Sequence, residues 1–377
     1  MTQLNSPKGK LIKLARQLYQ NAVSLNYGFV LWKFPGRRKP ELFIGKIKKQ
    51  KLSEITYPSY VIAPFQKNTD LVFVLEPFFY THVKEWFILN SKAHSDSDVK
   101  KKNDDSRMEL TGNEIMQSGA IKDPHFLDIV SKAIQDIEDE KLVKVVLSRQ
   151  KQIKLPDKFD PVDLFFRLTY SYNGAFVSFL SSKETGNWIT ASPELLFHST
   201  KNRFRTVALA GTQPNPSNIK QFSLKDKMEC RVVANHIREI CKTYNLKYDE
   251  DRLRVRSAGN VCHLEKRFYV EKQGMSNYDI IKKLHPTPAI CGTPIDLAYD
   301  FILYHEEHPR GFYSGFVGPV YNKDHLHFYV NLRCMKFFNQ QATLYAGAGI
   351  VKDSSPEDEL KETENKMLTL MNILTKK

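Results

Sequence analysis

Short apolar runs that alternate with polar positions recur along most of this chain, and this pattern is typical of β-strands. The runs predict strands at residues 27–33, 42–47, 60–65, 71–75, 144–153, 175–181, 188–191, 195–199, 203–209, 253–256, 264–270, 312–320, 325–338 and 343–346. Helical periods predict helices near residues 126–139, 219–244, 278–284 and 294–307. Because the helices interrupt runs of adjacent strands without strict β-α alternation, we predict an α+β fold, with a largely antiparallel β-sheet core flanked by helices.

Two stretches bear on the domain organisation. The N-terminal stretch is basic as far as Glu41, and its apolar positions follow a helical period at Leu11, Leu14, Ala15, Leu18 and Ala22. We interpret it as the first helix of the fold, with an organelle transit peptide as the alternative. Residues 91–107 are rich in Ser, Asp and Lys, which predicts an exposed, mobile loop between an N-terminal part, residues 1–107, and a larger part, residues 108–377.

Length and composition predict a globular protein. With 377 residues and 41% hydrophobic content, the chain can bury a large core. Its longest apolar run, near residues 71–80, is far shorter than the roughly 20 residues that cross a bilayer, so we expect no transmembrane helix and no membrane partner. The five cysteines are odd in number and form no Cys-x-x-Cys pair, which favours a reducing cytoplasm.

The formal net charge of +14 suits a nucleic acid, an anionic membrane or an anionic small molecule as a partner. The basic residues are scattered among acidic ones, without an Arg-rich stripe or an aromatic RNA-binding signature. A basic nucleic-acid-binding protein is therefore the alternative from another class, and we expect no nucleic-acid partner.

Glu359, Glu362 and Lys366 form the most informative cluster, because steps of three and four residues place them on one face of a predicted helix. A turn predicted at residues 347–350 precedes this helix. An isolated pattern of this kind is usually a solvated face with ion pairs inside the helix. The remaining motifs of the chain favour a site instead.

Candidate chemistry recurs at four earlier places. Lys144 opens an apolar strand, although a lysine there usually extends its ammonium to solvent. Glu194 stands at a proline-containing turn between strands, and the Gly211-Thr212 dipeptide follows a strand directly, which suits close approach of the backbone to a ligand. Asp226 and Glu229 lie three residues apart on one face of a helix, which is also an ordinary surface pattern.

Three downstream stretches complete the set of motifs. Residues 284–294 contain Pro286, Pro288 and Pro294 and predict a rigid loop of the kind that shapes a pocket wall. Residues 310–315 and 331–333 supply further lining, and Arg333 suits a bidentate contact with a carboxylate. In order and spacing, the motifs from Lys144 to Lys366 resemble those of the chorismate-utilising enzymes, and within them the isochorismate synthases.

The strand Lys-Val-Val-Leu-Ser-Arg at 144–149 and the loop Pro-Thr-Pro-Ala-Ile-Cys-Gly at 286–292 carry the resemblance to the isochorismate branch. Anthranilate-forming relatives differ at both places, and aminodeoxychorismate-forming relatives have a lysine where this chain has Ala210. The chain departs from the family pattern in a short connection from Gly211 to Glu229 and in Cys230, where a histidine often stands.

The resemblance implies that residues 108–377 bind chorismate and isomerise it to isochorismate, with water adding at C2 and the C4 hydroxyl leaving. It implies Lys144 as the general base and Glu194 as the general acid, which requires a partly neutral lysine and a protonated glutamate near neutral pH. It also implies a Mg²⁺ cofactor, held directly by Glu229 and Glu362 and through water by Glu359 and Asp226.

The resemblance further implies the substrate contacts. The ring carboxylate would meet the metal and the backbone at Gly211 and Thr212, and the enolpyruvyl group would meet Arg333, Lys366 and the amides near Gly347. His263 would lie near the departing hydroxyl, and the wall would contain Ala289, Ile290, Tyr313, Leu332 and Tyr345. A small Ala289 favours hydration over loss of pyruvate, so a salicylate synthase is the alternative. We expect a monomer whose product passes to an isochorismate-using enzyme, in a menaquinone, siderophore or salicylate pathway.

Overall fold

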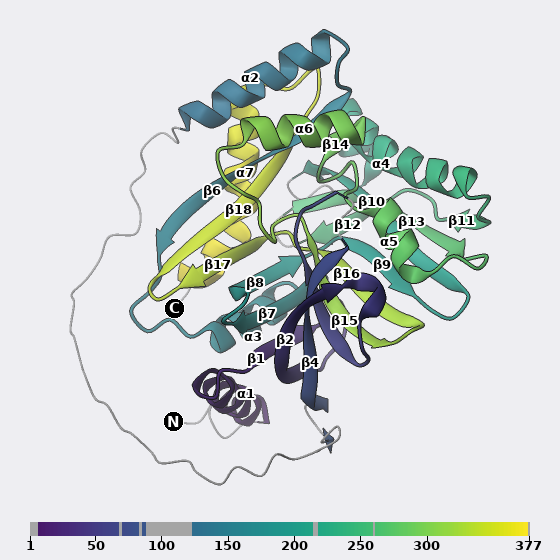
Figure 1. Ribbon diagram of the computed structural model, residues 1–377. Coiled ribbons are helices and arrows are strands. Elements are labelled where there is room, and N and C mark those ends of the chain that lie inside the picture. Colours follow the sequence, from purple (N-terminus) through teal and green to yellow (C-terminus); the bar gives the residue numbers. More distant parts are fainter. Residues whose placement is uncertain are drawn as a thin grey trace.

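The computed structural model describes residues 7–67, 70–82, 85–87, 123–213, 218–258 and 261–375. The predicted loop at 91–107, and with it the boundary between 1–107 and 108–377, lies outside the described residues. Within the described ranges the chain forms seven α-helices and 18 strands that pair into one sheet (Figure 1).

The strands follow most of the predicted apolar runs. They are β1 (Gly28–Lys33), β2 (Glu41–Lys51), β3 (Ser59–Ala63), β4 (Leu71–His82), β5 (Glu85–Phe87), β6 (Lys144–Lys154), β7 (Phe176–Ser182), β8 (Gly186–Ser192), β9 (Leu195–Ser199), β10 (Arg203–Gln213), β11 (Tyr248–Glu250), β12 (Arg254–Ala258), β13 (Val261–Glu271), β14 (Gly292–Thr293), β15 (Phe316–Asn322), β16 (His325–Val330), β17 (Cys334–Phe338) and β18 (Gln341–Ile350).

The strands pair in the order β14-β6-β18-β17-β8-β7-β1-β2-β4-β3-β15-β16-β9-β10-β13. β11 and β12 also pair with β13, and β5 pairs with β4. Every pairing among the described strands is antiparallel, which confirms the predicted α+β fold with an antiparallel sheet. The order also brings β6 and β18 together, although they lie far apart in sequence.

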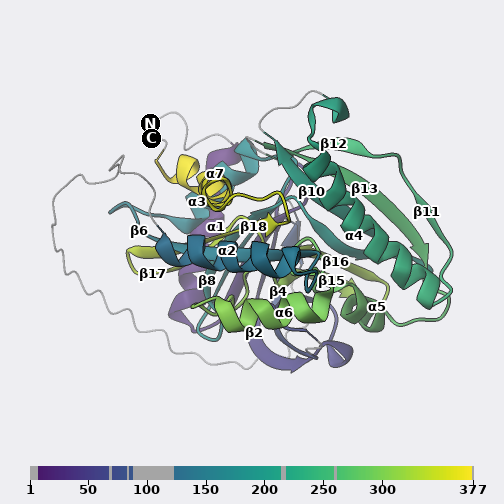
Figure 2. The same cartoon turned by 90° about the horizontal axis from the view of Figure 1, so that it is seen from above.

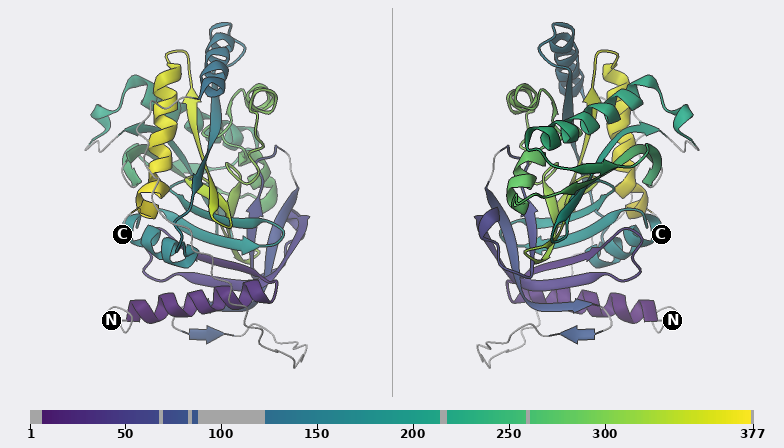
Figure 3. Two further views of the ribbon diagram at one scale, coloured as in Figure 1. Left: turned by 90° about the vertical axis from the view of Figure 1, so that its left-hand side faces the viewer. Right: turned by 90° about the vertical axis from the view of Figure 1, so that its right-hand side faces the viewer.

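Helices cover the sheet in three groups. They are α1 (Pro7–Ser24), α2 (Pro124–Glu138), α3 (Pro161–Ser171), α4 (Leu224–Thr243), α5 (Asn277–Leu284), α6 (Ile295–His305) and α7 (Pro356–Thr375). Seen from above, α2 lies between α7 and α6, over β6 and β18 (Figure 2). α4 packs on β10 and β13, and α1 and α3 pack on β1 and β7 at the opposite end from α2 (Figure 3). Ala15 and Ala22 of α1 are buried in that core, which confirms α1 as a helix of the fold.

Four local predictions were wrong. The single strand predicted over residues 325–338 is divided into β16 and β17 by residues 331–333. Residues 347–350 are not a turn, because they continue β18 and pair with residues 145–148 of β6. The predicted helix 219–244 is split into a 3₁₀ turn at Ile219–Gln221 and α4, because Ser223 caps α4 by accepting a hydrogen bond from the Asp226 amide at 3.0 Å. A helix was not predicted at α3, which begins at Pro161 and is capped by Asp160.

A buried cluster rich in aromatic side chains joins strands from distant parts of the strand order. Trp188 stacks on Tyr345 with ring centroids 5.4 Å apart, and Tyr345 stacks on Tyr313 at 5.5 Å. Trp32 and Tyr60 belong to the same buried cluster. Packing in this cluster therefore fixes the rings of Tyr313 and Tyr345. None of the helices in the described ranges is both long and apolar enough to cross a membrane.

Candidate active site

A cavity of about 80 Å³ lies where β6, β10, β13, β18 and α7 meet. Of the predicted site residues, all except Asp226 and Glu359 line it, namely Lys144, Glu194, Gly211, Thr212, Glu229, His263, Ala289, Ile290, Tyr313, Leu332, Arg333, Tyr345, Gly347, Glu362 and Lys366. A wider groove of about 900 Å³ lies at Arg203 and Glu271, at the other ends of β10 and β13, and contains none of them. The smaller cavity is therefore the candidate site.

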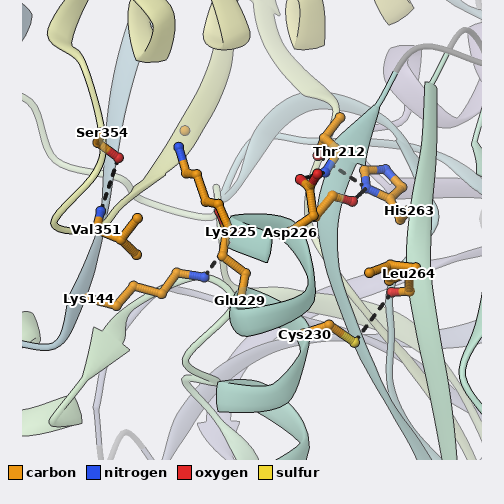
Figure 4. Close-up of polar contacts among 12 residues, drawn as sticks. Lys144, Thr212, Lys225, Asp226, Glu229, Cys230, His263, Leu264, Val351 and Ser354 are labelled. Carbon is orange, nitrogen blue, oxygen red and sulfur yellow. Dashed lines mark hydrogen bonds and ion pairs between the residues drawn. The ribbon is translucent and has the colours of Figure 1, made fainter. Parts of the chain in front are cut away.

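Lys144 is the first residue of β6 and is almost fully buried, with 2% of its side chain exposed. Its Nζ lies 3.3 Å from Oε2 of Glu229, which projects from α4 (Figure 4). Gly349 of β18 leaves room for this ion pair, because a Cβ there would lie 2.9 Å from Cε of Lys144 and 3.2 Å from Oε2 of Glu229. A side chain at this position would force the far ends of Lys144 and Glu229 to shift.

Glu194 lies in the turn between β8 and β9, and its carbonyl oxygen accepts a hydrogen bond from the Val330 amide at 3.0 Å. The residue is 3% exposed. Burial raises the pKa of the carboxyl to about 8, and the nearby charges of Lys144 and Lys366 offset only part of that rise. Glu194 is thus a protonated acid at neutral pH, the state that its predicted role requires.

Gly211 forms a β-bulge in β10, where the pairing register with β13 shifts between Ala210 and Thr212. Its φ of +73° lies in the left-handed region, and a Cβ would lie 2.8 Å from Cβ of Asp226, so glycine suits this position. Asp226 holds the bulge, because its Oδ1 accepts from the Thr212 amide at 3.2 Å.

The second oxygen of Asp226 accepts from Gln213 at 2.7 Å and from the amide and hydroxyl of Ser223 at 2.9 and 2.8 Å. Both carboxylate oxygens are thus used inside the protein. The structure places Asp226 as the residue that connects α4 to the bulge, and outside the cavity lining.

His263 and Arg333 form a fixed pair in the cavity wall. Nδ1 of His263 lies 3.1 Å from the Gly211 carbonyl oxygen, and its Nε2 lies 3.4 Å from NH2 of Arg333. A guanidinium only donates, so Nε2 accepts and the proton sits on Nδ1. Burial first, and then the charges of Arg333 and Lys366, lower the pKa of His263 to about 3, so the ring is neutral.

Arg333 stands between β16 and β17 with a φ of +48°, an uncommon conformation for a residue other than glycine. Its NH1 donates to Oγ1 of Thr369 on α7 at 2.9 Å. Burial lowers the pKa of the guanidinium, but it stays charged because its ordinary pKa is far above neutral. It is therefore a buried cation held in the cavity wall by Thr369 and His263.

Glu359, Glu362 and Lys366 share one face of α7, as their spacing predicted, and Glu362 and Lys366 line the cavity. Lys366 Nζ lies 2.6 Å from Oε1 of Glu362 and donates to the Gly347 carbonyl oxygen at 2.7 Å. Glu359 is 1% exposed and pairs with Lys225 of α4 at 2.5 Å. Burial and the Glu362 charge raise the pKa of Glu359 although Lys225 lowers it, while Lys366 keeps the pKa of Glu362 below its ordinary value despite burial.

Lys225 was not predicted as a site residue. Its position four residues before Glu229 on the same helix is the signal that could have found it. Figure 4 shows Lys225 extending from α4 toward the segment that carries Ser354, while Cys230 points the other way and lies 3.8 Å from the Leu264 carbonyl oxygen. The unusual Cys230 is therefore a packing residue. The short connection predicted from Gly211 to Glu229 includes residues 214–217, which are outside the described ranges.

The carboxylates of Glu229, Glu359 and Glu362 are the type of ligand that a hard divalent cation prefers, because Mg²⁺ binds one or two carboxylates and retains water. The buried Oε2 of Glu359 has no hydrogen-bond partner, so one acceptor is available beside Glu362 and Glu229. As the side chains stand, lysines hold these acids, and no three His, Cys, Asp or Glu residues in the described ranges are arranged to hold a metal.

The loop that carries Ala289 and Ile290 closes the cavity on one side. Arg310 fixes it, because its guanidinium donates to the carbonyl oxygens of Ile290 at 2.8 Å and of Val146 at 2.6 Å. Glu306 pairs with Arg310 at 2.6 Å, so this buried cation is neutralised away from the cavity. Leu332 lines the wall, and its carbonyl oxygen accepts from Thr190 at 2.7 Å.

Curated relatives resemble this chain over about two thirds of its length. "Isochorismate synthase DhbC" of Bacillus subtilis (strain 168) is 30% identical over 264 residues, which are 65% of this chain and 66% of that protein. "Isochorismate synthase MenF" of Escherichia coli (strain K12) is 28% identical over 257 residues, 65% of this chain and 59% of that protein. The match thus spans slightly less than two thirds of these relatives.

Solved structures share the fold over more of the chain. A structure described as a putative 2,3-dihydroxybenzoate-specific isochorismate synthase, DhbC, from Bacillus anthracis gives a TM-score of 0.73 at 23% identity and covers 96% of this chain and 99% of that one. MenF, the menaquinone-specific isochorismate synthase from Escherichia coli, gives 0.72 at 20% identity, with 93% and 89% covered. The predicted fold and the resemblance to isochorismate synthases are confirmed. Residues 46–375 match the family described as "Chorismate binding enzyme", and the chain belongs to that family.

Proposed function

We propose that this protein is a Mg²⁺-dependent isochorismate synthase, an isomerase that converts chorismate to isochorismate. The observation that carries the proposal is the pairing of a protonated buried acid, Glu194, with a buried lysine, Lys144, in one cavity. Hydration at one carbon and loss of hydroxyl at another need a base and an acid together. The curated relatives with this activity in their names support the same reaction.

In the proposed reaction, Glu194 donates its proton to the C4 hydroxyl as that group leaves. Lys144 Nζ accepts a proton from the water that adds at C2. In the structure the Lys144 ammonium is paired with Glu229, so this ion pair must break before the lysine can act as a base. Neutral His263 can orient a hydroxyl but cannot donate from Nε2, which lacks a proton.

Glu229 and Glu362 are the proposed direct ligands of Mg²⁺, with Glu359 beside them through water. When bound, the ion supplies positive charge that neutralises a substrate carboxylate and holds it against the protein. Both carboxylate oxygens of Asp226 already accept hydrogen bonds from the bulge and the start of α4, so we propose that it positions the Gly211 bulge and is not a direct ligand. The backbone at Gly211 and Thr212 can then receive one substrate carboxylate, while Arg333 and Lys366 receive the other.

The test is to incubate the purified protein with chorismate and Mg²⁺, with and without EDTA, and to identify products by chromatography and mass. Isochorismate in a fixed ratio to chorismate, lost with EDTA and absent with Lys144→Ala, is the expected result. Salicylate with pyruvate would assign the protein to the salicylate synthases. Unreacted chorismate would reject the proposal.

Three further properties belong to the same proposal. We propose a monomer, in which one chain supplies the lining of the candidate site. All five cysteines are free and buried, which fits a reducing cytoplasm. An isochorismate-using enzyme would act downstream, and the similar solved structures include a menaquinone-specific and a putative 2,3-dihydroxybenzoate-specific isochorismate synthase.

A further inference from the structure

Lys225 makes the shortest ion pair at the edge of the candidate site. Its Nζ lies 2.5 Å from Oε1 of Glu359, and the pair connects the first turn of α4 to the first turn of α7, 134 residues later in the sequence. Glu359 is 1% exposed, whereas 28% of the Lys225 side chain is exposed. A buried carboxylate is thus neutralised by a cation that reaches it from the protein surface.

More than one acid acts on this ammonium. Burial lowers the pKa of Lys225, but Glu359, followed by Glu229 and Glu362, raises it above its ordinary value. These three carboxylates are the acids beside the proposed metal position. The charge of Lys225 therefore stabilises the cluster that a divalent cation would also stabilise.

The second oxygen of Glu359 shows that the lysine satisfies the carboxylate only in part. Oε2 is buried and makes no hydrogen bond of 3.5 Å or less, although the nearby Ser354 hydroxyl lowers the pKa of the Glu359 carboxyl. A lysine ammonium is a compact point charge, which suits contact with one oxygen of this group. An unsatisfied buried acceptor favours any cation that can reach both Glu359 and its neighbours.

Lys225 also differs from the other two lysines of the cluster. Lys144 and Lys366 line the cavity, and Lys366 additionally donates to the Gly347 carbonyl oxygen. Lys225 does not line the cavity, and its only described side-chain hydrogen bond is to Glu359. Its side chain can leave without breaking a contact that shapes the substrate wall.

We propose that Lys225 is a positioning residue that occupies the acid cluster when no divalent cation is bound and is displaced from Glu359 when one binds. This inference rests on the proposed Mg²⁺ dependence and adds a competitor for the metal that is built into the chain. The ammonium keeps Glu359 and α7 in place without metal, and it weakens the affinity for Mg²⁺ because the ion must displace it.

Amine labelling of the unmodified chain tests the displacement directly. The metal-stripped protein is treated with limiting acetic anhydride, with and without saturating Mg²⁺, and acetylation is followed by peptide mass spectrometry. We expect Lys225 to react faster with Mg²⁺, because its ammonium leaves Glu359, while Lys227 on the same turn of α4 keeps its rate as the internal control. An unchanged or slower Lys225, or an equal change at both lysines, would overturn the proposal.

Mg²⁺ titration of variants by calorimetry gives the second test. Lys225→Met should bind Mg²⁺ more tightly by at least about tenfold, because one charge in contact changes the ionic affinity of a buried carboxylate by this factor or more. Lys225→Arg keeps the charge and should stay near wild type, and Lys227→Met controls for the loss of one positive charge on the helix. Equal affinities for the two methionine variants would refute the competition.

The two proposals fail separately. A protein that leaves chorismate unchanged but shows Mg²⁺-dependent labelling of Lys225 would retain this inference and lose the activity. If the protein forms isochorismate but the acetylation rate of Lys225 does not change with Mg²⁺, the proposed activity stands and the proposed role of Lys225 is rejected.

Discussion

Replacing Glu194 with glutamine should stabilise the folded protein while it abolishes turnover. Glutamine keeps the size of the side chain and removes the titration. The pKa of Glu194 is raised from 4.5 to about 8 by burial, so folding holds a proton that the unfolded chain loses above pH 4.5. The wild-type protein is therefore destabilised by this residue at neutral pH.

The sign and size follow from the two pKa values. Below pH 4.5 the carboxyl is protonated in both states, and the substitution has no titration effect. Between 4.5 and 8 only the unfolded chain ionises, so wild-type stability falls relative to the variant, and above about 8 the gap stays constant. At about 1.36 kcal/mol per pH unit, the full gap is roughly 5 kcal/mol. Solvent screens little of this effect, because Glu194 is 3% exposed.

Urea unfolding of wild type and Glu194→Gln between pH 5 and 9 measures this gap. Glu184→Gln, at an exposed glutamate between β7 and β8, is the matched control and should track the wild type. Turnover in the wild type should fall as pH rises through about 8, because the acid is then ionised. A stability gap that does not grow from pH 5 to 8 would mean that Glu194 is ionised in the folded protein, and it would refute its role as an acid.

Five other substitutions test the site. Lys144→Ala should reduce turnover by about 10²-fold or more, the usual contribution of a general base, with an unchanged circular dichroism spectrum; near-normal turnover would remove it from the mechanism. Gly349→Ala should lower turnover with little loss of stability, because a Cβ would lie 2.9 Å from Cε of Lys144; wild-type kinetics would show that the ion pair can shift freely. Arg333→Lys should raise the KM for chorismate more than it lowers kcat, because lysine cannot make a bidentate contact with a carboxylate; an unchanged KM would contradict this. Alanine at Glu229 or Glu362 should raise the Mg²⁺ concentration needed for half-maximal turnover, and an unchanged titration would remove that glutamate from the metal site.

Local patterns predicted the strands well but misread residues 347–350. Two glycines in four residues usually indicate a turn. Here the glycines lie inside β18. A Cβ at Gly347 would lie 2.9 Å from the Leu147 carbonyl oxygen, and a Cβ at Gly349 would displace the end of the Lys144 side chain. In sequence, a glycine that makes room for a neighbouring side chain looks the same as a glycine in a turn. Only the pairing of residues 347–350 with β6 shows that these glycines belong to a strand.

The site residues show the same limit. The spacing of Glu359, Glu362 and Lys366 predicted their common helix face, and the Lys366–Glu362 pair is the intrahelical ion pair that the ordinary interpretation also predicts. What makes the cluster unusual is the burial of Glu359 against Lys225, a contact across 134 residues. Likewise, the raised pKa of Glu194 depends on burial that a turn sequence does not reveal.

The charges in the cavity give an independent reason for a cation. Among the described residues that line it, Lys144, Lys366 and Arg333 are positive, Glu229 and Glu362 are negative, and Glu194 and His263 are neutral at pH 7. Three cations against two carboxylates leave one positive charge. Chorismate carries two negative charges, so binding it alone would bury a net negative charge, which is costly without a partner. A divalent cation reverses that sign, so the proposed Mg²⁺ should act first on substrate affinity, and chorismate binding itself should weaken when the metal is removed.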